Sequence, residues 1–147
     1  MRLSQASDFA LRILMFLGQT DQPQTVERLS RTLGLARSHV MKIVAQLGRA
    51  GLIETTRGRG GGIRLLKDPN DIRVGDVVRE IEPDLGVVAC LQPIPTACSF
   101  LPCCGLKGAM AEAAKAFLDS LDGHSLADIL RGTQIARPAN TAENNNT

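Results

Sequence analysis

Four cysteines in the second half of the chain are the residues whose types and spacing could support chemistry. They are Cys90, Cys98, Cys103 and Cys104, and they fall within a span of 15 residues. Neighbouring side chains of an extended chain point in opposite directions, so Cys103 and Cys104 are poorly placed to bind one small centre together. One centre would therefore take three thiolates, and with Cys104 as the last of them the pattern is Cys-x7-Cys-x5-Cys.

Metal binding and redox catalysis are the kinds of chemistry that clustered cysteines favour in a cytosolic chain. A structural zinc site takes four protein ligands, commonly in close cysteine pairs, which this spacing does not provide. Three widely spaced thiolates instead resemble the ligands of an iron–sulfur cluster that takes its fourth ligand from elsewhere. Zinc stays open as an alternative. A thiol oxidoreductase is disfavoured, because the chain has no Cys-x-x-Cys motif at a helix start.

Charge divides the chain into two unlike halves. The 147 residues carry a net charge of +2, but residues 1–67 hold 11 Lys or Arg against 4 Asp or Glu, whereas residues 68–147 hold 6 against 11. The first half is thus +7 and the second −5. A basic half of this size favours a polyanionic partner such as nucleic acid. With four Phe and no Trp or Tyr, a platform for stacking single-stranded bases is not expected, so duplex DNA is the predicted partner.

Three amphipathic helices are predicted in the basic half. Ser4 can cap a first helix that ends near Gly18, and a second spans about 25–33, with Gly34 suited to its left-handed C-terminal cap. A third spans about 37–50, where apolar residues recur on one side and the other side carries His39, Lys42, Gln46 and Arg49. Two short helices joined by a glycine-containing turn, the second with a cationic outer face, predict a helix-turn-helix.

A β-hairpin is predicted directly after the third helix. Its strands lie at about 52–57 and 63–66, and the glycines and arginine between them form a basic tip. No Walker lysine follows these glycines, and they do not join a strand to a helix, which argues against a nucleotide-binding loop. A hairpin in this position is a wing. The predicted major-groove contacts are Arg37, Ser38, His39 and Lys42, and the predicted minor-groove contacts are Arg57, Arg59, Gly60 and Gly61.

The cysteines lie in a proline-rich loop that leads into a long helix. Residues 83–105 show no apolar periodicity and contain four prolines, which stiffen the backbone. A helix is predicted over 106–121, with a narrow apolar seam that packs either within the chain or against a second copy. We expect a second copy, because symmetric dimers read operators as two half-sites. The seam consists of Leu106, Met110, Ala113, Phe117 and Leu121.

Together these elements predict a mainly α fold with a small β-hairpin wing: a winged helix-turn-helix plus a long dimerisation helix. Residues 1–67 are the expected DNA-binding region, 68–131 the cluster-binding loop and dimerisation helix, and 132–147 a disordered tail. Further helices are expected at about 74–81 and 125–130. No apolar run approaches the roughly 18 residues of a membrane span, so we expect a cytoplasmic protein. The pattern indicates a binding protein and not an enzyme.

The order of these motifs resembles the IscR/NsrR-like family of winged-helix iron–sulfur regulators. The likeness covers residues 1–131. Three motifs carry the resemblance: Met1-Arg2-Leu3-Ser4-Gln5-Ala6-Ser7-Asp8-Phe9-Ala10-Leu11-Arg12, the wing Arg57-Gly58-Arg59-Gly60-Gly61-Gly62-Ile63-Arg64-Leu65, and Pro102-Cys103-Cys104-Gly105-Leu106-Lys107. The first and the last of these are most similar to the branch of the family that senses nitric oxide.

The resemblance implies a homodimeric transcriptional repressor that leaves operator DNA when nitric oxide reacts with its iron–sulfur cluster. It implies cluster ligation by Cys90, Cys98 and Cys104, with Asp8 of the partner subunit as the fourth ligand of a 4Fe-4S cluster. Cys103 stays open as a replacement for Cys104.

A second branch of the family suggests an alternative cofactor. That branch holds a 2Fe-2S cluster with a histidine three residues after the third cysteine, where this chain has Lys107. An iron- or redox-responsive 2Fe-2S regulator therefore stays open. Apart from any cluster, Asp8 also suits the start of a helix, where it can pair with Arg12 four residues on.

Overall fold

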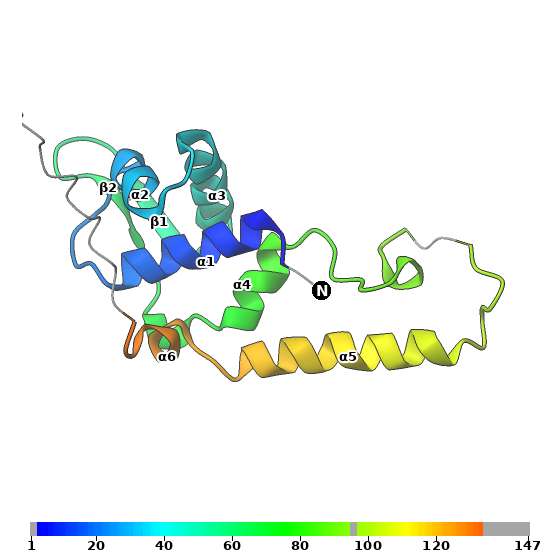
Figure 1. The fold of residues 1–147 in the computed structure, drawn as a ribbon. Coiled ribbons are helices and arrows are strands. Elements are labelled where there is room, and N and C mark those ends of the chain that lie inside the picture. The colour runs from blue at the N-terminus through cyan, green and yellow to red at the C-terminus, as the bar shows by residue number, and fades with distance from the viewer. Residues whose placement is uncertain (1–2, 95–96, 134–147) are drawn as a thin grey trace, which may run out of the picture.

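The computed structural model describes residues 3–94 and 97–133, which form a mostly helical fold with one two-stranded antiparallel hairpin (Figure 1). The predicted mainly α fold with a small β-hairpin wing is confirmed. The elements of the described chain are α1 (Gln5–Gly18), α2 (Val26–Leu33), α3 (Arg37–Arg49), β1 (Ile53–Thr56), β2 (Gly62–Leu65), η1 (Pro69–Asp71), α4 (Val74–Ile81), η2 (Ala89–Leu91), α5 (Gly105–Asp122) and α6 (Leu126–Leu130).

Local signals set the ends of the first two helices where the sequence predicts them. The Ser4 side chain accepts a hydrogen bond from the Ser7 backbone at the start of α1, and the Thr25 side chain accepts one from Arg28 at the start of α2. α2 ends at Gly34, whose φ of 65° is the left-handed conformation that glycine adopts without strain. These caps fix where the helix-turn-helix begins and turns.

The β1–β2 hairpin forms the predicted wing, and the backbone of Gln24 extends it. The two strands pair antiparallel, with Ile53 opposite Leu65. On the other edge of β2, Gln24 and Ile63 exchange two backbone hydrogen bonds with N to O distances of 2.9 and 2.8 Å. The loop between α1 and α2 is thereby tied to the wing. No local signal around Gln24 predicts this pairing, because the surrounding loop is polar and irregular.

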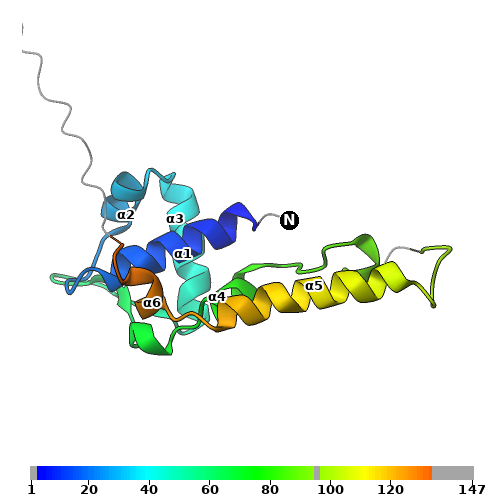
Figure 2. The ribbon, with the colours of Figure 1, turned by 60° about the horizontal axis from the view of Figure 1, so that its bottom comes forward.

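α1 lies at the centre of the molecule, with α2, α3, α4 and α6 around it (Figures 1 and 2). Ile13 and Leu14 of α1 and Leu47 of α3 are completely buried there. Val77 of α4 and Leu126 of α6 belong to the same core, so parts of the acidic half pack directly on the helix-turn-helix. The division of the chain at residue 67 stays a prediction.

α5 runs along one side of this core and extends well beyond it, beside the loop that carries the cysteines (Figures 1 and 2). Its end is held by Arg79 of α4, whose guanidinium donates hydrogen bonds of 2.7 and 2.6 Å to the two carboxylate oxygens of Asp122. These hydrogen bonds raise the pKa of Arg79 and lower that of Asp122. Gly75 lies so close to the Asp122 carboxylate that a Cβ would overlap it.

The predicted apolar seam of α5 is only partly covered in the described chain. No residue of α5 is fully buried. Met110, Phe117 and Leu121 are half-buried, whereas Leu106 and Ala113 are exposed. Packing of this seam against a second copy stays a prediction. The predicted disordered tail lies outside the described residues, apart from its first two positions.

Candidate functional site

α3 presents the predicted reading face to solvent. Its apolar stripe is buried in the core, which leaves Arg37, Ser38 and Lys42 exposed. The Arg37 guanidinium pairs with Glu27 of α2 at 3.0 Å, and both side chains are more than half exposed. Such an exposed ion pair is worth about 0–1 kcal/mol. A phosphate group could therefore take the place of Glu27 beside Arg37 at little cost.

His39 is exposed on the side of α3 that meets α1. Its ring stacks on Phe9 of α1, with ring centroids 5.8 Å apart and ring planes inclined by 30°. This contact connects α3 with α1, the helix that carries Asp8. Sequence periodicity could not predict it, because the two residues are 30 positions apart and lie on different helices.

The wing places two arginines at its tip. Arg57, Arg59 and Gly60 are exposed, and a hydrogen bond of 3.0 Å from the Gly61 N–H to the Gly58 carbonyl closes the turn. Gly58 and Gly60 have φ angles of 97° and 78°, which disfavour any side chain, and a Cβ on Gly61 would overlap the backbone of β1. The turn itself requires these glycines. They also leave its backbone free of side chains, so that it can approach a phosphate closely.

The four cysteines are free thiols along the loop between α4 and α5. Cys90 lies in η2 and Cys104 precedes the first residue of α5, and both are half-buried, while Cys98 and Cys103 are exposed. Within the part of the chain that the structure describes, no three His, Cys, Asp or Glu side chains are gathered closely enough to hold a metal ion. The predicted ligands, Asp8 included, are therefore not assembled as a set in this single chain. Their chemistry fits the predicted cofactor, because thiolates are the usual ligands of iron–sulfur clusters.

Asp8 lies in the first turn of α1 and is 46% exposed. Its carboxylate pairs with the guanidinium of Arg12 at 2.9 Å, which confirms the predicted contact between positions four residues apart. Since both side chains are about half exposed, exchanging Arg12 for another cationic partner would cost little free energy. The carboxylate is thus accessible to a group outside its own chain.

The beginning of α1 also contacts the start of the cysteine loop. The Ser4 N–H donates a hydrogen bond of 2.7 Å to the carboxylate of Glu82, the residue that follows α4. A cavity of about 420 Å³ lies beside this contact, and both Phe9 and His39 line it. Gln46 also lines the cavity, and its side-chain oxygen is buried without a hydrogen-bond partner among the described residues. The first turns of α1 thus contact both α3 and the start of the cysteine loop.

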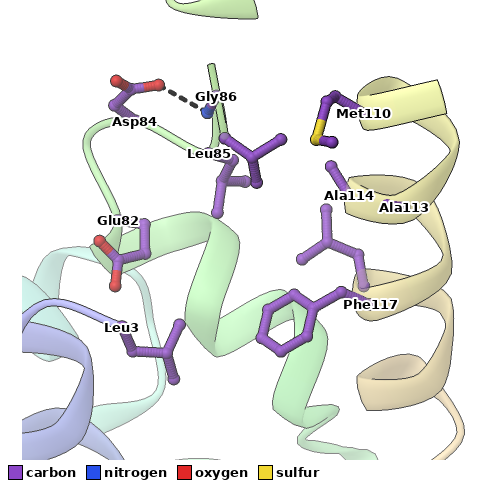
Figure 3. Close-up of a pocket in the computed structure, with 11 residues that line it drawn as sticks. Leu3, Glu82, Asp84, Leu85, Gly86, Met110, Ala113, Ala114 and Phe117 are labelled. Atoms are coloured by element: carbon purple, nitrogen blue, oxygen red, sulfur yellow. Dashed lines mark hydrogen bonds between the residues drawn. The ribbon is translucent and has the colours of Figure 1, made fainter. Parts of the chain in front are cut away.

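A larger cavity of about 530 Å³ separates α5 from the first residues of the cysteine loop (Figure 3). Leu3, Leu85 and Phe117 line it, and the carboxylate of Asp84 accepts a hydrogen bond of 2.7 Å from the Gly86 N–H at its edge. No thiol or imidazole is among its lining residues. The cavity lies beside the α5 seam, and apart from the Met110 thioether its lining offers no sulfur ligand.

Comparison with known proteins identifies the family of this chain. The model of the Rrf2 family, described as an iron-dependent transcriptional regulator, matches residues 3–132. The chain belongs to the Rrf2 family. The predicted resemblance to winged-helix regulators is confirmed by this match, which covers the helix-turn-helix, the wing, the cysteine loop and α5.

Relatives with substantial sequence identity are named transcriptional regulators. The HTH-type transcriptional regulator NsrR of Bacillus subtilis (strain 168) is 38% identical over 136 residues, which cover 91% of this chain and 93% of the relative. The regulator of the same name from Geobacillus kaustophilus (strain HTA426) is 42% identical over 132 residues, which cover 88% of this chain and 90% of the relative. This Rrf2 chain is a transcriptional regulator and not an enzyme.

Solved structures of Rrf2 regulators share the fold. CymR, the global cysteine regulator of B. subtilis, superposes with a TM-score of 0.74 at 22% identity and covers 91% of this chain and 99% of its own. IscR of T. potens superposes with a TM-score of 0.72 at 24% identity, over 91% of this chain and 89% of its own.

Among the described residues, no helix is both long and apolar enough to cross a membrane.

Proposed function

We propose that the chain is a cytoplasmic, homodimeric repressor that binds operator DNA and releases it when nitric oxide reacts with its iron–sulfur cluster. The observation that carries the proposal is the presence, in one Rrf2 chain, of an exposed basic reading surface and a loop of free thiols. Relatives named NsrR at 38% and 42% identity support the nitric-oxide-sensing branch over other branches of the family.

Cys90, Cys98 and Cys104 would hold the cluster, and Asp8 of the partner subunit would complete its ligands. A carboxylate is a harder and weaker partner than a thiolate for iron in a sulfide cluster, so Asp8 would be the exchangeable ligand. When bound, the cluster would supply iron that reacts with nitric oxide. Lys107 stands where a 2Fe-2S branch has histidine, which favours a 4Fe-4S cluster.

The contacts around Asp8 would allow a change at the cluster to move α3, the helix predicted to touch DNA. A released Asp8 carboxylate can pair with Arg12, at the distance of 2.9 Å seen in this chain. Phe9, the next residue, stacks on His39, so displacement of the first turns of α1 would also shift α3. In a dimer that reads half-sites about 34 Å apart, a shift of both reading helices would weaken binding to both half-sites at once.

Serine variants prepared and reconstituted without oxygen test the ligand assignment. Cys90→Ser, Cys98→Ser and Cys104→Ser should each lose stoichiometric iron and sulfide together with the visible absorbance. Cys103→Ser is the matched control, one residue away from Cys104, and should keep both. Asp8→Ala should still bind a cluster, but this variant should lose its cluster faster than the wild-type protein does.

Two outcomes would contradict this assignment. If Cys103→Ser loses the cluster and Cys104→Ser keeps it, the third ligand is Cys103. A colourless wild-type protein that contains stoichiometric zinc after anaerobic purification would favour a zinc-stabilised regulator and overturn the proposed sensor.

A further inference from the structure

Met41 is a large apolar side chain on the reading face of α3. Its side chain is 53% exposed. Within the described chain, α2 and α3 carry no other large apolar side chain that is exposed. The residues that bury α3 against the core are Val40, Ile43, Val44 and Leu47, and Met41 does not belong to this stripe. Packing of the chain therefore gives no reason for an apolar side chain at this position.

The neighbours of Met41 allow α3 to approach a partner closely. Ser38 lies about one turn before it and Ala45 one turn after it, and both are small and exposed. Exposed cationic side chains flank this strip at Arg37 and Lys42. An uncharged strip bordered by cations matches the floor of a DNA major groove bordered by phosphates.

The major groove presents one apolar group on its base edges, the 5-methyl of thymine, and apolar side chains contact it. Methionine is flexible and unbranched, so its terminal methyl can follow such a group into the groove. We propose that Met41 contacts a thymine 5-methyl in each half-site and makes thymine the preferred base there. This inference rests on the proposed function in one respect, that α3 reads duplex DNA.

Thymine-to-deoxyuridine replacement tests the contact, because it removes the 5-methyl and keeps the base pair. Binding sites are first selected from random duplexes with the full-length wild-type protein, prepared without oxygen. Each thymine of the selected site is then replaced in turn, and the Kd is measured for wild type, Met41→Ala and Met41→Gln. Met41→Gln keeps the length and helix propensity of methionine, and it loses the apolar end.

We expect one deoxyuridine position per half-site to weaken wild-type binding about fourfold, the effect on an equilibrium constant of burying one methyl-sized group. At that position the loss should disappear in both Met41 variants. Leu66→Ala is the matched control, because Leu66 is 54% exposed and lies outside α3. Its deoxyuridine profile should equal that of wild type.

The inference is overturned if wild-type binding ignores every deoxyuridine, or if the Met41 variants keep the wild-type profile. If Met41→Gln instead causes the dimer to separate into monomers and leaves the deoxyuridine profile unchanged, Met41 belongs to a protein interface. Failure of the wild-type protein to select any sequence would overturn the proposed function and this inference together.

Discussion

In the helix-turn-helix and wing, buried neighbours position the side chains predicted to touch DNA, whereas from Glu82 to His124 no described residue is fully buried. Arg37 and Lys42 stand on a helix whose opposite side is packed into the core. The thiols of the cysteine loop have no comparable support. One chain thus already positions the side chains predicted to touch DNA, whereas the proposed ligand set would need the cluster and a second chain.

The largest difference should appear when one side chain is truncated in each region. Leu47 of α3 is completely buried and Ile94 of the cysteine loop is 87% exposed. Leu47→Ala should lower the free energy of unfolding by about 2–5 kcal/mol, and Ile94→Ala should change it by less than about 0.5 kcal/mol. Urea unfolding of the cluster-free protein, followed by circular dichroism, gives both values. Equal losses would mean that the loop has a core of its own.

Removing cations that are predicted to touch DNA, on α3 and on the wing, should weaken DNA binding without affecting cluster binding. Arg37→Ala and Arg59→Ala should each weaken operator binding by roughly 5- to 150-fold, the effect of about 1–3 kcal/mol for a groove contact. The absorbance of the cluster should stay unchanged. Lys115→Ala, which removes an exposed cation from α5, is the control and should bind nearly as wild type. Normal binding by both arginine variants would show that the reading surface is misplaced.

Phe9 should affect how strongly the two regions communicate. Loss of its stacking on His39 should reduce the ratio of DNA affinities before and after nitric oxide, by a factor of about 2–10 for an aromatic pair worth about 0.5–1.5 kcal/mol. The measurement is that ratio in Phe9→Leu and in wild type. Phe100→Leu provides a matched control, because Phe100 is 76% exposed on the cysteine loop. An unchanged ratio in Phe9→Leu would show that this contact does not connect the cluster to α3.

The smallest effect concerns the attachment of α5. Hydrogen bonds from Arg79 lower the pKa of Asp122 below its ordinary value of 3.8, so the pair stabilises the fold above that pH and loses this contribution as the pH falls through the lowered pKa. Asp122→Asn should slightly reduce the Tm at pH 7, and the difference from wild type should vanish in acid. Glu112→Gln makes the same charge change at an exposed position of the same helix. An equal Tm loss in both variants would mean that net charge, and not this pair, is responsible.

Features encoded by neighbouring residues were predictable from the sequence. Ser4, Thr25 and Gly34 set the helix ends through side chains or conformations within a few residues, and the wing followed from alternating strands around glycines. Contacts between distant elements left no such signal. The Phe9–His39 stack, the Ser4–Glu82 hydrogen bond and the Arg79–Asp122 pair depend on how helices pack.

The cysteine site shows a further limit of sequence reasoning. Residue type and the family resemblance predict the ligands, but among the described residues these side chains are not gathered into one site. Met41 was missed for another reason. The expected contacts were charged or polar, and the available signal was an apolar residue outside the buried stripe of its helix.

In the proposed function, the state of the cluster controls DNA binding. The most direct test is a titration of the wild-type protein with nitric oxide, in one anaerobic sample that also contains a selected operator duplex. Cluster absorbance and the fluorescence anisotropy of the DNA are recorded together. If the cluster controls DNA binding, the anisotropy should fall in step with the loss of cluster absorbance. A DNA affinity that stays constant while the absorbance disappears would contradict it.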